Sequence, residues 1–169
     1  MVIRPVRVVL LLFWGTCGFQ NLAGGAPEPV VYRNVAFDFC FTLPADWSGY
    51  SIVNDEWKGQ WIGEGSRPAS GPPLEGVEIL IRHPKWTSSA PREDIPIMIF
   101  SIAQWKLVAA EEVGVSAAPI GPAGLGRNAK YVFALPPRYS FDEKEGVEEV
   151  VDLMNHHPLR APCPAATRR

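Results

Sequence analysis

The sequence predicts one small α+β domain, in which a mostly antiparallel sheet is flanked by helices. Three observations support this prediction. Several short segments alternate apolar and polar side chains, as half-buried strands do. Two further segments place apolar side chains at helical spacing, and each of them follows strands along the chain. Finally, 17 prolines and 15 glycines among 169 residues favour short elements joined by turns over a bundle of long helices.

The expected strands are short segments bounded by turn residues, at 35–43, 50–53, 77–81, 95–100 and 130–135. In the first strand every second residue from Phe37 to Leu43 is apolar, and Pro44 ends it because proline has no amide proton for the ladder. Residues 50–53 are expected to pair back with this strand as a hairpin. The segment 95–100 is apolar almost throughout, which predicts a strand that is buried on both faces.

Two helices are expected, each with a recognisable start. The first begins at Ser101, because its spacing to Gln104 matches a capping box. The second follows a similar pattern formed by Asp142 and Glu145, and Pro158 ends it. The apolar faces are expected to hold Ile102, Trp105, Val108 and Ala109 in the first helix, and Val147, Val150, Val151 and Met154 in the second.

A secretory signal peptide is expected at residues 1–25. Arg4 and Arg7 give it a positively charged start, and an uncharged apolar run follows at 8–14. This run is far shorter than the ~20 residues that a spanning helix needs, so no transmembrane span is expected in the mature chain. The expected destination is the periplasm or the extracellular space. Lipidation at Cys17 is disfavoured, because the three residues before it depart from a lipobox.

The remainder is expected to comprise a linker at 26–34, the single α+β domain at 35–158 and a disordered tail at 159–169. Two cysteines lie in this part, Cys40 and Cys163. An oxidising compartment permits a disulfide between them. Because a disulfide also needs close Cα atoms, which spacing does not reveal, we expect two free thiols.

The charge balance argues against nucleic acid as a partner. The chain has 16 basic and 18 acidic residues, and loss of the signal peptide leaves 14 basic residues against 18 acidic ones. Binding to a phosphate backbone needs a basic excess. No nucleic-acid partner is therefore expected.

The segment 37–47, FDFCFTLPADW, resembles the first strand and the P-x-x-W turn of the PsbP/Mog1-like superfamily. From about residue 36 to 157 the chain is also similar to a family of exported bacterial proteins with no assigned activity. The stretches that carry this second resemblance are 81–87, 94–100 and 128–139. The resemblance implies an antiparallel sheet with flanking helices, export, and a role in binding or assembly rather than catalysis.

Tryptophans in or beside loops are the candidate binding residues. An exposed indole next to arginine or lysine can stack on a sugar ring, a peptide or a cation. We therefore expect a pocket for a glycan or a small apolar ligand, lined by Trp47, Trp57, Trp61 and Trp86 with polar partners from Asp55, Glu56 or Arg82. The best local example is the cluster of Arg82, His83, Lys85 and Trp86. A second possible site is formed by Arg127, Arg138 and Tyr139, where Arg138 could hold a carboxylate. The alternatives are that the rings belong to the core and that Arg138 pairs with an acid at the start of the second helix.

The sequence predicts no catalytic set, metal site or cofactor. Neither G-x-S-x-G nor H-E-x-x-H occurs. An enzyme hypothesis stays open in the form of a hydrolase, with His83 as base, Ser88 or Ser89 as nucleophile and Asp94 as orienting acid. The simpler expectation is that His83 closes a strand and bonds to the backbone.

The expected function is that of an exported, non-enzymatic domain that binds an envelope or extracellular ligand through its aromatic loops. Two alternatives remain. One is an accessory or assembly factor that docks on an envelope protein, and the other is the hydrolase that uses His83.

Overall fold

A computed structural model describes residues 27–62, 72–117, 120–137 and 144–165, so the expected signal peptide, Cys17, Arg138, Tyr139 and Asp142 lie outside the described residues. In chain order the elements are β1 (Val30–Asn34), β2 (Phe39–Leu43), the 3₁₀ helix η1 (Ala45–Trp47), β3 (Ser51–Lys58), β4 (Gln60–Trp61), β5 (Glu75–Arg82), β6 (Ile95–Ser101), α1 (Ile102–Ala109), β7 (Val113–Gly114), β8 (Ala123–Arg127), β9 (Tyr131–Leu135), α2 (Val147–Asn155) and β10 (Leu159–Arg160).

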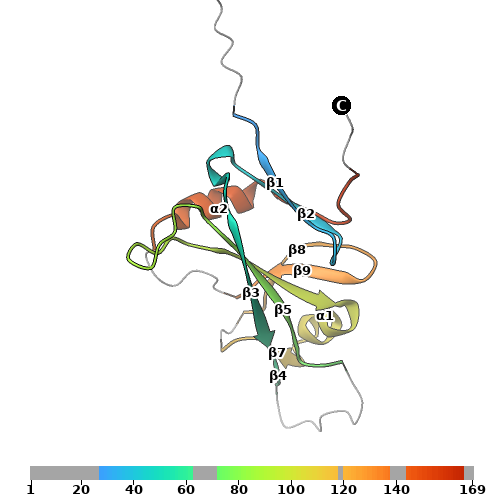
Figure 1. Cartoon of the computed structure of the whole chain (residues 1–169). Helices are drawn as coiled ribbons and strands as arrows, with labels where there is room; N and C mark the ends of the chain where they lie inside the picture. Colours follow the sequence, from blue (N-terminus) through green and yellow to red (C-terminus); the bar gives the residue numbers. More distant parts are fainter. Residues whose placement is uncertain (1–26, 63–71, 118–119, 138–143, 166–169) are drawn as a thin grey trace, which may run out of the picture.

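A five-stranded sheet with the order β3-β5-β6-β9-β8 forms the middle of the structure (Figure 1). All of its neighbouring strands are antiparallel. A smaller sheet has the order β1-β2-β10, and β4 pairs with β7. The expectation of an α+β fold with a mostly antiparallel sheet is therefore confirmed. Among the described residues, no helix has the length and apolar character needed to cross a bilayer.

The central strand β6 is buried on both faces, as its apolar run predicts. Six consecutive residues, from Ile95 to Phe100, are buried. Its odd-numbered isoleucines belong to one hydrophobic core, and Met98 and Phe100 belong to a second core on the opposite face. Each face of the sheet therefore needs a covering layer.

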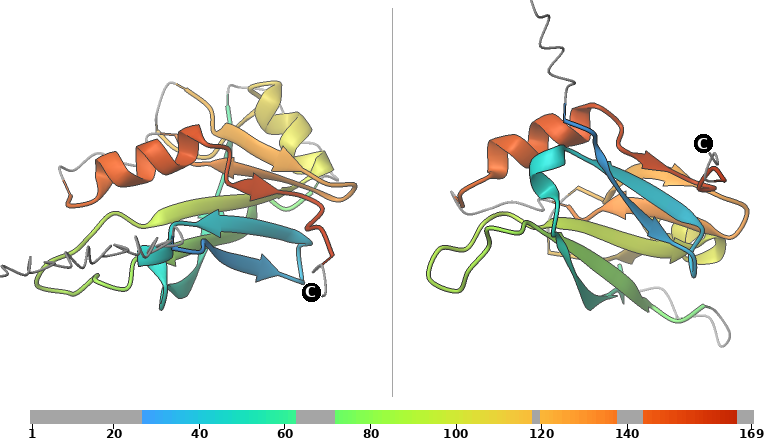
Figure 2. Two further views of the ribbon diagram at one scale, coloured as in Figure 1. Left: turned by 90° about the horizontal axis from the view of Figure 1, so that it is seen from above. Right: turned by 45° about the horizontal axis from the view of Figure 1, so that its top comes forward.

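The first core lies between the large sheet, the small sheet and α2. Phe39 and Phe41 of β2 meet Phe133 of β9, and α2 contributes Val150 and Leu153. Figure 2 shows α2 beside β1, β2 and η1. The face of α2 differs from the predicted one, because Leu153 is buried whereas Val151 is 41% exposed. The helix starts at Val147 after a left-handed Gly146, and among the described residues no side chain caps this start.

The second core lies under α1 on the other face of the sheet. Val108 of α1 packs with Trp57, Phe100 and Val132. The predicted capping box is confirmed: the Ser101 hydroxyl accepts from the Gln104 amide, and the Gln104 side chain accepts from the Ser101 amide. With only eight residues, α1 covers only part of this face.

Three expectations about chain organisation are wrong. Residues 30–34, expected within a linker, form β1, and residues 159–160, expected in a disordered tail, form β10. Both strands pair with β2: β1 forms a short hairpin with it, and β10 is a segment remote in sequence that satisfies its other edge. The expected hairpin does not form either, since β3 pairs with β5. Between β2 and β3 the buried Trp47 anchors η1, where the chain passes from the small sheet to the large one.

A glycine in β5 gives a test of the second core. Gly76 lies opposite Trp57, and a Cβ at this position would stand 2.6 Å from the indole Nε1. Gly76→Ala is expected to displace the buried indole and to lower the free energy of unfolding by about 1–3 kcal/mol. Chemical denaturation measures this change.

Gly121→Ala is the matched control, because nothing lies within 4 Å of the added methyl group. It should change the free energy of unfolding by no more than about 0.5 kcal/mol. Equal stability of the two variants would contradict the burial of Trp57 against Gly76.

Candidate functional site

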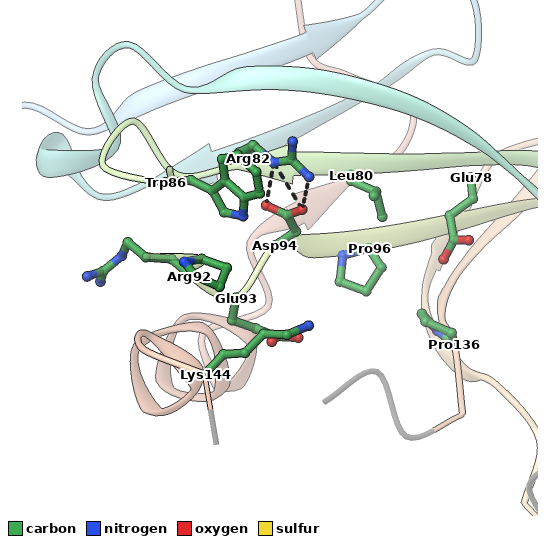
Figure 3. Close-up of a pocket in the computed structure, with 11 residues that line it drawn as sticks. Glu78, Leu80, Arg82, Trp86, Arg92, Glu93, Asp94, Pro96, Pro136 and Lys144 are labelled. Carbon is green, nitrogen blue, oxygen red and sulfur yellow. Dashed lines mark hydrogen bonds and ion pairs between the residues drawn. The ribbon is translucent and has the colours of Figure 1, made fainter. Parts of the chain in front are cut away.

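The candidate site is a groove on the part of the sheet that α1 leaves uncovered. Glu78 is the register partner of Met98, so alternate residues of β5 from Glu78 onward share the face that carries α1. Beyond the helix these side chains border a groove of about 410 Å³ (Figure 3). It is lined by Glu78, Leu80, Arg82, Trp86, Pro91, Arg92, Glu93, Asp94, Pro96, Pro136 and Lys144. This volume suits a small ligand.

Arg82, Asp94 and Trp86 form the best-defined part of the groove (Figure 3). The Arg82 guanidinium donates from Nε to Oδ1 of Asp94 at 3.1 Å and from Nη2 to Oδ2 at 2.7 Å. This fork raises the pKa of Arg82 above its ordinary value, because the carboxylate stabilises the cation. The same guanidinium lies 4.0 Å from the centroid of the Trp86 ring. The half-buried indole of Trp86 is therefore held by the Arg82 guanidinium, whose position is fixed by Asp94.

The rest of the groove mixes both signs of charge with proline surface. Glu78 and Glu93 contribute carboxyl groups, and Lys144 contributes an amine. Burial raises the pKa of Glu78, and the nearby Asp55 raises it further. Because neither sign dominates, the groove suits a ligand that presents hydroxyl donors and acceptors together with an apolar face.

His83 lies on the opposite face from Arg82, although the two are neighbours in sequence. Its side chain is 2% exposed and makes an edge contact with Trp47, with ring centroids 4.8 Å apart. Nδ1 accepts a hydrogen bond from the Lys85 amide at 3.0 Å. Burial lowers the pKa of His83, and Arg92 lowers it further. The imidazole is therefore neutral near pH 7, with its proton on Nε2.

This tautomer excludes His83 as a metal ligand in the arrangement observed. Atoms of Asp46, His83 and Glu149 lie within 4.8 Å of one another. However, Nε2 carries a proton and has no lone pair for a cation, while Nδ1 is occupied by the backbone. Glu149 already accepts from the Trp47 indole at 2.5 Å and from Arg92 at 2.8 Å. We interpret the cluster as a network that joins η1, β5 and α2.

The arrangement hypothesised for a hydrolase is not present. Asp94 is bound to Arg82 rather than to His83, and Nδ1 of His83 accepts from a backbone amide. A general base needs a lone pair that faces the substrate, and this ring presents none. The simpler expectation, in which His83 closes a strand and bonds to the backbone, agrees with the structure.

The other predicted site residues are distributed over separate places. Trp57 is 3% exposed, and its indole donates to the Ile99 carbonyl at 2.9 Å. Trp61 packs against the same second core, and its Nε1 is buried without a hydrogen-bond partner in the described part of the chain. Lys85 is exposed. The structure thus brings Arg82 and Trp86 together in the groove and places Trp57, Trp61 and His83 elsewhere.

Asp94 had a sequence signal that points to its role. Arg82 ends one strand and Asp94 directly precedes the next, so antiparallel pairing of the two strands brings them side by side. Arg92 and Lys144 had no such signal. Arg92 reaches Glu145 and Glu149, which lie more than 50 residues further along the chain.

The buried imidazole predicts a pH-dependent stability. In the unfolded chain His83 takes up a proton near its ordinary pKa of 6.5, whereas the fold holds the neutral form to lower pH. The free energy of unfolding should therefore fall as the pH is lowered from about 7 to about 5, by up to about 1.4 kcal/mol per pH unit for this one group. Urea denaturation at each pH measures it.

His83→Asn removes the titrating group while its side-chain oxygen still accepts from the Lys85 amide. As the pH is lowered over this range, the free energy of unfolding of the variant should fall less steeply than that of the wild type. His156→Asn, at the exposed end of α2, is the matched control for removal of an imidazole. An unchanged decline in His83→Asn would contradict a neutral, buried His83.

Comparisons with known proteins provide no relative. No family model, no curated protein and no solved structure matches the chain. The assignment of the groove therefore depends on its own geometry.

Proposed function

We propose that this chain is an exported, non-enzymatic binding protein whose groove beside Trp86 takes a polyhydroxylated ligand, a glycan of the cell envelope. The observation that supports this most is the stack of Arg82 on Trp86, with Arg82 forked to Asp94. A ring whose position is fixed before binding loses little entropy when a sugar ring stacks on it. The paired guanidinium of Arg82 and carboxylate of Asp94 lie beside the ring. Such planar polar groups can bind the hydroxyl groups of a sugar.

The mixed charge of the groove favours a glycan over a charged ligand. Arg82, Arg92 and Lys144 are balanced by Glu78, Glu93 and Asp94 around the same space. Arg82 is already paired with Asp94, and Arg92 with Glu145 and Glu149, so these groups offer a charged ligand no uncompensated partner. A neutral ligand rich in hydroxyl groups meets donors and acceptors without an uncompensated charge.

We also propose a PsbP/Mog1-like sandwich as the finer fold class. The support consists of the antiparallel five-stranded sheet with helices on both faces, together with the turn from Pro44 to Trp47. The resemblance implies binding and accessory roles, which agrees with the proposed binding groove, whose lining does not include His83. This part of the proposal is an analogy of fold.

The groove is tested by co-sedimentation with purified insoluble cell wall. The wild type should pellet with the wall, and Trp86→Ala should weaken binding about tenfold, because the stacking surface and its partner for Arg82 are lost. Trp105→Ala is the matched control, since Trp105 is a half-buried indole that packs in the second core. It should bind like the wild type.

Two outcomes would count against the glycan. If the wild type stays in the supernatant, the insoluble wall is not its ligand, and crosslinking in envelope extracts tests a protein partner next. Equal binding of wild type and Trp86→Ala would place the site elsewhere. Circular dichroism of each variant separates lost binding from lost folding.

Export is tested separately by the mature N-terminus. The proposal rests on the positively charged start, the apolar run at 8–14 and the small residues at 23–26. Mass spectrometry of the secreted or periplasmic chain should give a new N-terminus close to Ala26. Arg4→Glu together with Arg7→Glu should leave the uncleaved chain in the cytoplasm, and processing of that variant would contradict a signal peptide.

A further inference from the structure

The small sheet brings together the two cysteines of the described chain. Cys40 lies in β2, and its register partners are Arg33 of β1 and Arg160 of β10. Arg160 is the last residue of β10 and lies opposite Cys40, and Cys163 follows it by three residues. The chain therefore leaves β10 next to Cys40. Figure 2 shows the segment after β10 running beside the end of the hairpin formed by β1 and β2.

Three hydrogen bonds hold Cys163 in this place. Arg33 donates from Nη1 to Sγ of Cys163 at 2.8 Å and to the carbonyl of Pro164 at 2.7 Å. The Cys163 amide donates to Oδ1 of Asp38 at 3.2 Å. Arg33 is opposite Cys40 in the sheet, and Asp38 precedes Cys40 by two residues, so the contacts that fix Cys163 surround Cys40.

The thiols of Cys40 and Cys163 are close enough to influence each other. Cys40 is 5% exposed, and its burial together with the neighbouring thiol of Cys163 raises the pKa of Cys40 to about 11. Cys163 is half-buried and is thus the thiol that a reagent in solution reaches. Both are free thiols in the structure.

We propose that Cys40 and Cys163 form a disulfide when the chain meets a disulfide donor, a modification that ties the segment after β10 to β2. The donor is a disulfide oxidoreductase or a small-molecule disulfide. An exported chain meets such donors, so the cellular setting of this inference rests on the proposed export and not on the groove.

The reaction is an exchange in two steps. The Cys163 thiolate attacks one sulfur of the donor, the donor S–S bond breaks, and the other donor sulfur leaves as a thiolate. Cys40 then loses its proton to solvent and attacks Sγ of Cys163, which expels the second donor thiolate. The two cysteines lose two protons and two electrons in total, and the donor disulfide gains two electrons and becomes two thiols.

The experiment uses the full chain with Cys17→Ser, so that only these two thiols react. The protein is equilibrated in buffers of reduced and oxidised glutathione, quenched by alkylation and analysed by mass spectrometry. The expected product has lost two hydrogen atoms and carries no glutathione. The midpoint is the glutathione redox ratio at which half of the chain carries the disulfide. In urea this midpoint should move to a ratio at least about tenfold more oxidising, because the unfolded chain no longer holds the two sulfurs together.

Single-cysteine variants complete the test. In the same background, Cys40→Ser and Cys163→Ser cannot form the internal bond, and Cys40→Ser should accumulate the glutathione adduct on Cys163. The inference is overturned if the two-cysteine chain accumulates glutathione adducts or covalent dimers, or if urea leaves the midpoint unchanged. Since the assay supplies its own donor, failure of the disulfide and failure of export are separate results.

Discussion

Burial of β6 on both faces is the constraint from which the rest of the architecture follows. Every residue from Ile95 to Phe100 is buried, and the strand contributes side chains to both hydrophobic cores. A strand of this kind is stable only if both faces of its sheet are covered. The small sheet and α2 cover one face, and α1 covers part of the other. Because α1 is short, the second face is only partly covered, and the groove lies on the part that remains open.

The alternation of side chains along β5 separates two kinds of polar site. Arg82 points to the partly open face, where it holds Trp86 and Asp94. His83 points to the closed face, where it is buried against Trp47 and its Nδ1 is bound to the backbone. The two residues look like one cluster in the sequence. In the fold, one belongs to the candidate groove and the other to a network around Glu149 that fixes α2 to the sheet.

The tryptophans show how burial decides the role of an aromatic residue. The indole donor of Trp57 finds the Ile99 carbonyl inside the second core, and that of Trp47 finds Glu149. An indole whose N–H group is hydrogen-bonded inside the protein stabilises the fold through the apolar surface that it buries. Such a ring is not available to a ligand. Trp86 differs because its contact is a surface cation, and so it retains a partly open ring.

Features that depend on neighbours a few residues apart could be predicted from the sequence. These include the capping box at Ser101, the doubly buried strand at 95–100 and the α+β class. They follow from side-chain periodicity and from hydrogen bonds that span three residues, both of which are local. The pairing of β2 with β10, the approach of Cys163 to Cys40, and the reach of Arg92 to Glu149 depended on tertiary structure alone. Any strand edge offers the same backbone groups, so only packing of the whole chain selects which remote segment satisfies them.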